Sequence, residues 1–222
     1  MTYSLIIPIY NEERTLPLLL SKLDLLNNNI EVIIIDDGST DETKNILNAQ
    51  GKFVTVRNNT NIGKGSSIRK GIELAKNKNV ILIDGDLEVD VNDIPELIIK
   101  YENNNADALI GVRVTKNKNL NFDINSIGNY LINGFFNLLF KTNFNDVLCC
   151  VRILNLNLFK SLKIKSNRFS IEVETIAKLV LKNSNLKEAY IKYNRRTFAE
   201  GKKLKFYDGW NIIWTIIKLK FK

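Results

Sequence analysis

Residues 79–90 read NVILIDGDLEVD, and this stretch decides which fold and which chemistry the chain supports. Four apolar residues, 80–83, lead directly into Asp84, and Asp86, Glu88 and Asp90 follow at alternate positions. A short continuous apolar run is typical of a strand that is buried on both faces, as in a parallel sheet. Carboxylates brought close together repel each other unless a cation or a proton lies between them. The stretch therefore predicts a charged site at the end of a buried strand.

Similar apolar runs occur on both sides of this stretch and alternate with helical patterns. We expect strands at 4–9, 31–35, 53–56, 80–83 and 106–112, with helices between them. This alternation predicts an α/β fold with a mostly parallel central sheet and helices on both faces. In the less regular second half we expect helices at 127–140, 171–181 and 207–219, and strands at 146–154 and 187–193. No linker divides the chain, so residues 1–222 are predicted to form one domain.

Composition excludes several kinds of site. The 222 residues contain no His and only two cysteines, the adjacent Cys149 and Cys150, which excludes zinc sites of the usual kind and Ser-His-Asp triads. The net charge of +8 favours an anionic partner, but acids at strand ends argue against a nucleic-acid groove. A strand follows Met1 almost at once, and no apolar run reaches about 20 residues. We therefore expect a cytoplasmic protein without a membrane-spanning helix.

The acidic run admits three specific interpretations. A calcium-binding loop is rejected, because Val89 and Pro95 stand where Gly and Glu are needed. A phosphatase that uses Asp84 as its nucleophile is a distant alternative. The third interpretation is a divalent cation held by Asp84 and Asp86 that binds a diphosphate, since hard cations prefer carboxylate and phosphate oxygens. In that case Gly85 would let the backbone approach the ligand closely.

Two further polar clusters follow apolar strands, at residues 10–12 and 36–39. Each has a simpler explanation, because Asp, Gly and Ser are common turn residues and acids favour the first turn of a helix. Neither a Walker A loop nor a GxGxxG fingerprint is present. In open α/β sheets, however, ligands bind outside the carboxyl ends of the strands. Three acid-bearing strand ends on one edge therefore predict a single cleft.

The motifs also occur in a characteristic order: IIPIYNEE, IDDGSTDET, NIGKGSSIRKG and DGDLEVD, followed by GVR at 111–113, DVLCCVR at 146–152, RFSIEVE at 168–174 and YNRRTFAEGKKLKFYDG at 193–209. This order resembles family-two glycosyltransferases of the GT-A fold, and among them the polyprenyl-phosphate mannosyl- and glucosyltransferases. The resemblance implies a nucleotide-sugar-binding half at 1–113 and an acceptor-binding half at 114–222. It implies inverting, metal-dependent transfer of a hexose from GDP-mannose or UDP-glucose to a polyprenyl phosphate at the inner face of a membrane.

The resemblance also implies roles for individual residues. The nucleotide sugar would be bound by Pro8, Tyr10, Asn11, Glu12, Asp36, Asp37, Gly63, Lys64, Asp84, Gly85 and Asp86. Mg²⁺ or Mn²⁺ would be held by Asp84 and Asp86, with Glu88 as a further ligand. The acceptor phosphate would be bound by Arg113, Arg152, Arg195, Arg196, Lys202 and Lys203, and the catalytic groups would be Asp86, Arg113 and Arg196. Cys149 and Cys150 replace the small residues usual before Arg152, which leaves the placement of the acceptor open.

Two alternatives remain open at this point. A lipid phosphate is already ionised near neutral pH and needs cations but no general base, whereas a hydroxyl of a glycan or glycolipid needs a carboxylate base, for which Asp146, Glu172 and Glu174 are candidates. Helix 207–219 carries two Trp residues and ends in Lys residues. That composition suits either an interfacial anchor on anionic lipid or a helix packed on the core.

Overall fold

The computed structural model describes residues 2–26, 29–115, 124–196 and 206–221. The strands are β1 (Tyr3–Ile9), β2 (Ile30–Asp36), β3 (Val54–Arg57), β4 (Asn79–Leu82), β5 (Ala108–Thr115), β6 (Arg152–Asn155) and β7 (Leu186–Tyr193). The helices are α1 (Leu16–Asp24), α2 (Thr43–Ala49), α3 (Lys64–Leu74), α4 (Ile94–Asn103), α5 (Ile124–Phe140), α6 (Leu156–Ser161), α7 (Ile171–Leu181) and α8 (Phe206–Lys220), with a 3₁₀ turn, η1 (Val91–Asp93), before α4. The predicted α/β alternation is confirmed.

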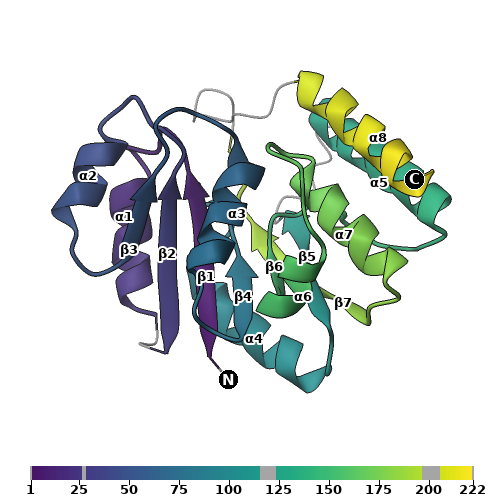
Figure 1. The fold of residues 1–222 in the computed structure, drawn as a ribbon, viewed down its shortest axis with the longest axis horizontal. Coiled ribbons are helices and arrows are strands. Elements are labelled where there is room, and N and C mark those ends of the chain that lie inside the picture. Colours follow the sequence, from purple (N-terminus) through teal and green to yellow (C-terminus); the bar gives the residue numbers. More distant parts are fainter. Residues whose placement is uncertain (1, 27–28, 116–123, 197–205, 222) are drawn as a thin grey trace.

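The described strands form one sheet in the order β3-β2-β1-β4-β6-β5-β7. All pairs are parallel except those of β6, which runs antiparallel to both β4 and β5. The carboxyl ends of β1, β2 and β4 therefore meet at one edge of the sheet, at the top of Figure 1. This edge carries the acidic clusters.

The prediction of a strand over 146–154 is wrong in its extent. Of the residues in this range, only those that belong to β6 pair with neighbouring strands. β6 runs antiparallel to both of its neighbours, β4 and β5. The residues before it are held by side chains instead: the Leu148 amide donates to Asp146 and the Val147 amide donates to Asn133. The six-residue helix α6 was not expected, because it is too short to show a helical period; the side chain of Asn155 caps its first turn.

Alternate residues of the strands pack on opposite faces of the sheet. On one face β1 contributes Leu5, Ile7 and Ile9, which pack with α1 and α4. On the other face β1 contributes Ile6, which packs with α3, α6 and α7. Burial on both faces explains why the strands are continuous apolar runs.

Helices α5 and α8 form an outer layer against α7. They lie side by side in Figure 1 and share a cluster that includes Phe136, Ile176, Ile212 and Ile216, all buried. Within the described parts of the chain, no helix is both long and apolar enough to cross a membrane.

Candidate active site

The loops that follow β1 and β2 are tied to each other by side chains. Asn11 has a φ of 49°, a left-handed conformation that Asn tolerates. Its amide donates to Ser39 Oγ over 2.9 Å, and its side-chain oxygen accepts from the Thr40 amide over 2.8 Å. The Glu12 amide donates to Thr43 Oγ1 over 2.8 Å. These bonds fix the Glu12 carboxylate at the carboxyl edge of the sheet.

Both acids of the DDGST segment are buried and accept several hydrogen bonds. Asp36 accepts from the amide and hydroxyl of Ser39 and forms an ion pair with Arg57. Asp37 accepts from the amides of Ile62 and Gly63, at 3.1 and 2.8 Å, and from the side chains of Asn58 and Ser67. The structure therefore uses these carboxylates to shape the loop that leads into α3. No motif in the sequence indicated their partners.

Gly63 directly precedes α3 and has a φ of 102°, which favours glycine. A Cβ at this position would lie 2.4 Å from the backbone oxygen of Asn167 and 2.9 Å from Cγ of Arg168. The glycine thus lets residues 167–168 lie against the start of α3. This contact brings the second half of the chain to the edge formed by the first half.

Lys64, the first residue of α3, lies between two carboxylates from distant parts of the chain. Its ammonium is 2.7 Å from Asp84 Oδ1 and 2.5 Å from Glu172 Oε1. Burial by itself lowers the pKa of Lys64, but Asp84 and Glu172 outweigh it and raise the pKa above its ordinary value. The second carboxylate oxygen of Glu172 is buried and has no hydrogen-bond partner among the described residues. This oxygen therefore makes no hydrogen bond that offsets its burial.

Arg196 joins the other acids of the edge. Its guanidinium donates two hydrogen bonds to Glu12, at 2.9 and 3.1 Å, and one to Asp86 Oδ2 at 3.1 Å. Burial, together with repulsion from Asp84 and Glu88, raises the pKa of Asp86 to about 7 even though Arg196 lowers it. A carboxylate in such surroundings is stabilised by a further positive charge.

Glu88 connects the acidic segment to the chain that follows β7. Its two carboxylate oxygens accept from the Tyr193 hydroxyl at 2.7 Å and from the Arg196 amide at 2.9 Å. Its backbone oxygen accepts from the Asn194 amide at 2.8 Å. Glu88 thus positions Arg196. Tyr193 was not singled out from the sequence, although it begins one of the quoted motifs.

The acids at this edge suit a divalent cation whose coordination shell is completed by oxygens of a ligand. They suit a cation held by protein groups alone less well. No group of three His, Cys, Asp or Glu side chains is placed to hold a metal ion in the described residues. Both oxygens of Glu88 already receive protein donors, but so do both oxygens of Asp84, from Lys64, and both oxygens of Asp86, from the Glu88 amide and Arg196. A cation bound by Asp84 and Asp86 would therefore replace contacts of Lys64 and Arg196. Paired carboxylates of this kind commonly bind a cation together with substrate phosphates.

Packing against β1 explains why a glycine stands at position 85, which the sequence alone did not show. A Cβ at this position would lie 2.3 Å from Cγ2 of Ile9 and 3.0 Å from Cγ2 of Ile7. The glycine therefore lets the turn between Asp84 and Asp86 pack on β1.

The arginines predicted to bind the acceptor phosphate lie in different surroundings. Arg113, on β5, forms a two-point ion pair with Asp146, at 2.7 and 2.8 Å, and its guanidinium lies 5.3 Å from the centre of the Tyr193 ring. Arg152 is buried, and its guanidinium donates to the backbone oxygen of Glu172 at 3.0 Å. That placement argues against a phosphate-binding role for Arg152. Arg195 is half-buried after β7.

Three other groups of predicted residues have separate outcomes. Lys202 and Lys203 lie outside the described residues. Glu174 accepts from the amides of Lys165 and Ser166 and pairs with Lys178, so it braces a loop and is a poor candidate for a base. The other candidates, Asp146 and Glu172, lie beside Arg113 and Lys64 respectively.

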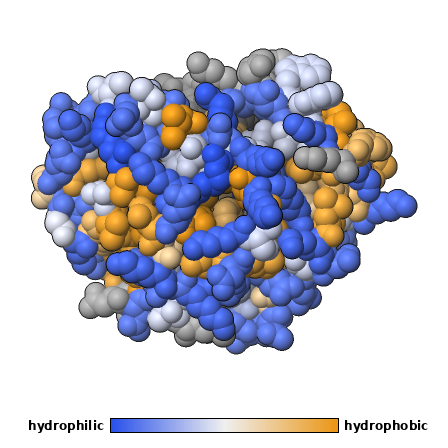
Figure 2. Space-filling model, viewed as in Figure 1, coloured by the Kyte–Doolittle hydropathy of each residue, from blue (hydrophilic) through white to orange (hydrophobic). Residues whose placement is uncertain are grey.

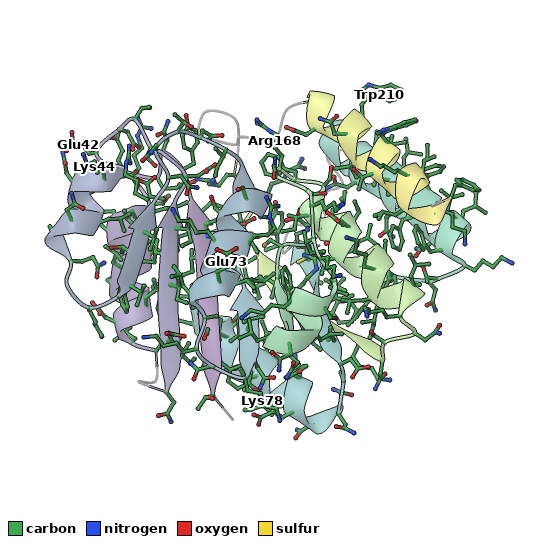
Figure 3. All side chains as sticks on the ribbon, viewed as in Figure 1. Glu42, Lys44, Glu73, Lys78, Arg168 and Trp210 are labelled. Atoms are coloured by element: carbon green, nitrogen blue, oxygen red, sulfur yellow. The ribbon has the colours of Figure 1, made fainter. Side chains whose placement is uncertain are left out.

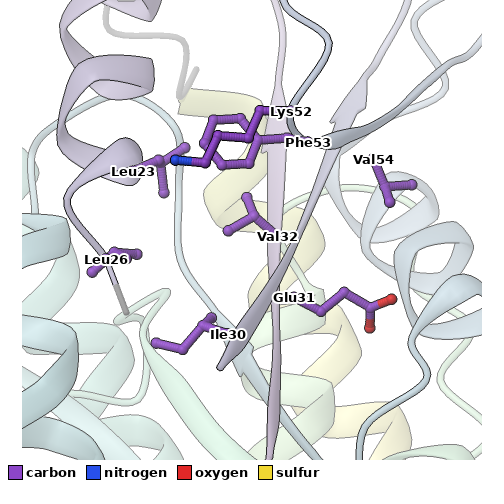
Figure 4. A pocket seen from close by; sticks show the side chains of 8 residues that line it. All are labelled: Leu23, Leu26, Ile30, Glu31, Val32, Lys52, Phe53 and Val54. Atoms are coloured by element: carbon purple, nitrogen blue, oxygen red, sulfur yellow. The ribbon is translucent and has the colours of Figure 1, made fainter. Parts of the chain in front are cut away.

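A hollow at the opposite edge of the sheet, where the strands begin, does not involve these charged groups. Figure 4 shows it between the end of α1 and the first residues of β2 and β3, lined mainly by apolar side chains, among them Leu23, Val32 and Phe53. It faces the amino ends of the strands, whereas the charged residues described above lie at the carboxyl ends.

The predicted nucleotide-binding residues are brought together at one edge. Pro8, Tyr10, Asn11, Glu12, Asp36, Asp37, Gly63, Lys64, Asp84, Gly85 and Asp86 lie at the carboxyl ends of β1, β2 and β4 or at the start of α3. The mostly parallel sheet with an acid pair after β4 agrees with the predicted GT-A fold. The sequence pattern of glycosyl transferase family 2 matches residues 4–163, and the chain belongs to this family. It is therefore a glycosyltransferase.

The chain is also similar to individual relatives and, in its fold, to solved structures. An uncharacterised protein of Methanocaldococcus jannaschii is 31% identical over 198 residues, which are 84% of this chain and 85% of that protein. Dodecaprenyl-phosphate galacturonate synthase of Rhizobium johnstonii is 28% identical over 72% of this chain, and the match spans only 50% of that enzyme. Glucosyl-3-phosphoglycerate synthase of Mycobacterium tuberculosis, crystallised with Mn²⁺, UDP and its product, superposes with a TM-score of 0.75 at 16% identity, over 99% of this chain and 80% of that one.

The contact of Lys64 with two acids leads to a stability prediction. Lys64→Met is expected to lower the free energy of unfolding by about 3 kcal/mol, because it leaves Glu172 and Asp84 without their cation. Adding Glu172→Gln should restore at least about 1 kcal/mol, since the uncompensated charge is then removed. Urea unfolding of the four proteins of this double-mutant cycle measures both values. Additive effects of the two substitutions would contradict a direct interaction.

Proposed function

We propose that this protein transfers a hexose, mannose or glucose, from a nucleoside diphosphate sugar to a polyprenyl phosphate, with inversion at the anomeric carbon. The observation that carries the proposal is the pairing of Asp84 and Asp86 with one basic side chain each, Lys64 and Arg196, at the carboxyl edge of the sheet. Carboxylates that can bind a metal ion therefore lie next to basic side chains that can bind phosphates. The Rhizobium relative named for a polyprenyl-phosphate product supports the lipid acceptor.

Asp84 and Asp86 would hold Mg²⁺ or Mn²⁺, which supplies positive charge to the departing diphosphate. Lys64 and Arg196 would donate hydrogen bonds to its phosphate oxygens. Glu12 and Glu88 act through Arg196: Glu12 orients its guanidinium, and Glu88 holds its backbone. The loop shaped by Asp37 forms the nucleotide end of the site. Arg113, from β5, would bind the acceptor phosphate, which needs no base because it is already ionised.

One observation favours a second acceptor class. The unpartnered oxygen of Glu172 is buried beside Lys64, where it could accept a proton from a hydroxyl group of a glycan or glycolipid. Glu172→Gln decides between the acceptors, because loss of a base abolishes transfer to a hydroxyl but not to a phosphate. The assignment to family 2 removes the phosphatase alternative.

The donor site is tested by thermal unfolding with UDP, GDP, CDP or dTDP, each with and without Mn²⁺. A ligand at about 100 times its dissociation constant adds roughly 2.7 kcal/mol of stability. For a chain of this size that corresponds to an increase in Tm of about 5–11 °C. We expect one nucleotide to give such an increase only when Mn²⁺ is present. No increase with any of the four would contradict the proposed donor site.

A further inference from the structure

Helix α8 presents an aromatic face to solvent. Trp210, Trp214 and Phe221 are 63%, 68% and 76% exposed, and Lys218 lies between the last two. Trp210, Trp214 and Lys218 are spaced by four residues, so they share one side of α8, and Phe221 directly follows the helix. On the other side Ile212 and Ile216 are buried in the outer cluster. One side of α8 is therefore packed on the protein, and no described residue covers the opposite side, which carries the two tryptophans.

Helix α5 adds apolar side chains to the same outer layer. Its exposed large side chains are Ile127, Tyr130, Leu131 and Leu138, while Phe136 is buried. Seven of the sixteen exposed large apolar side chains in the described residues lie on α5, on α8 or directly after α8. White and orange atoms accordingly gather over these helices at the upper right of Figure 2. We call these seven residues, with Lys218, the α5–α8 face. A concentration of this kind marks an interaction surface.

The chemistry of this face fits a membrane surface. Trp and Tyr favour the boundary between lipid and water, where the ring is apolar and one end meets water. Lys218, Lys220 and the net charge of +8 favour anionic headgroups. A second copy of the chain fits less well, because a two-fold contact pairs the face with itself, and the face then brings a Lys218 from each copy and no acid to balance them. We infer that the α5–α8 face docks on the surface of an anionic bilayer.

The face is joined to the active site. Asp208, at the start of α8, forms an ion pair with Arg168, with Nε and Oδ1 3.6 Å apart. Arg168 in turn lies over Gly63, next to Lys64. Docking through α8 would therefore bring the carboxyl edge of the sheet close to the lipid headgroups. This consequence rests on the proposed function, because only a lipid acceptor requires it, whereas the docking itself does not depend on catalysis.

The tryptophans provide a direct measurement. The chain contains only two, Trp210 and Trp214, so its tryptophan fluorescence reports on this face alone. The probe is vesicles of phosphatidylcholine and phosphatidylglycerol, without nucleotide or polyprenyl phosphate. We expect the emission to shift to shorter wavelength and brominated lipids to quench it. With pure phosphatidylcholine, binding should be at least about tenfold weaker. Unchanged emission with anionic vesicles would overturn the inference.

Matched variants test the face in vesicle sedimentation. Trp210→Ser with Trp214→Ser should weaken binding at least about tenfold, whereas Leu18→Ser with Ile99→Ser, which removes two exposed apolar side chains on α1 and α4, should not. Lys218→Glu should weaken binding to anionic vesicles, and Lys44→Glu, on α2, should not. Figure 3 shows Lys44 and Trp210 on opposite sides of the molecule. Equal binding by the face variants and their controls would refute the inference.

Two controls separate the possible failures. Vesicle binding without sugar transfer would refute the proposed function but not the docking inference. Sugar transfer without vesicle binding would refute the docking inference but not the proposed function. Sedimentation equilibrium shows whether a second copy covers the face. A dimer that the Trp210→Ser, Trp214→Ser variant dissociates, together with no vesicle binding, would overturn the inference. If that variant does not fold, the Lys218→Glu variant and the fluorescence of the unchanged protein still decide.

Discussion

Asp86→Asn is expected to remove metal-dependent nucleotide binding and to lower kcat/KM at least about 100-fold, yet to make the protein without ligands more stable. The loss follows from the removal of one of two carboxylates proposed to hold the cation, and removal of one charge-stabilising group from a transfer site typically costs this much. The gain follows from the surroundings of Asp86, where burial and the neighbouring acids Asp84 and Glu88 disfavour its charge. Such opposed effects are characteristic of residues kept for function rather than stability.

The pH dependence of stability has a definite sign. The pKa of Asp86 is about 7 in the folded protein, compared with 3.8 for a free Asp side chain, so the folded state binds this proton more tightly. The contribution of Asp86 to stability is therefore most favourable below about pH 4 and declines as the pH rises to about 7. We expect Asp86→Asn to exceed the unchanged protein in free energy of unfolding by about 1–2 kcal/mol at pH 8, and by less at pH 5.

Asp90 provides a matched control in the same acidic run. It pairs with Lys22, a residue of α1, at 2.7 Å. Burial raises the pKa of Asp90, but hydrogen bonds from Lys22 and Asn92 outweigh it, and the pKa is lowered overall. Asp90→Asn should therefore lower stability slightly at neutral pH and leave nucleotide binding unchanged. Urea unfolding at pH 5 and pH 8, with nucleotide titrations in Mn²⁺, measures each effect. Loss of stability in Asp86→Asn at pH 8 would contradict the explanation.

Arg196→Gln is expected to lower kcat/KM at least about 100-fold, because the proposed phosphate ligand is lost. At the same time it should strengthen binding of Mn²⁺ alone, because the guanidinium no longer shares Asp86 with the cation. Nucleotide with Mn²⁺ should bind more weakly. Arg196→Lys should not restore activity, since an ammonium group does not reproduce the two-point contact with Glu12.

Isothermal titration with Mn²⁺ alone, and with the nucleotide that raises Tm, measures the two binding effects of the Arg196 variants. Lys192→Gln is the control, because this exposed side chain lies four residues earlier on β7. It should leave both affinities unchanged. Unchanged Mn²⁺ affinity in Arg196→Gln would show that the cation does not compete with the guanidinium. Unchanged kinetics for donor and acceptor would remove Arg196 from the active site.

The sequence by itself determined the layered α/β fold and most of the residues that lie at the carboxyl edge of the sheet. Continuous apolar runs that alternate with helical patterns have few solutions other than a covered, mostly parallel sheet, so the strand ends and their polar residues could be placed. The acid pair was visible because Asp84 and Asp86 follow a buried strand directly. The short helix α6 and the reversal of β6 were not visible, because neither produces a periodic signal of its own.

Only the tertiary structure decided what each charged side chain does. Arg113 and Arg152 are both arginines in quoted motifs, but one is paired with Asp146 at the end of β5 and the other is buried against backbone oxygens. Glu88 continues the alternation of acids, yet the chain after β7 occupies both of its oxygens. Lys64 meets Glu172 across 108 positions of sequence. Such pairings depend on which strands become neighbours in the sheet, and local sequence patterns carry no record of partners so far away in the chain.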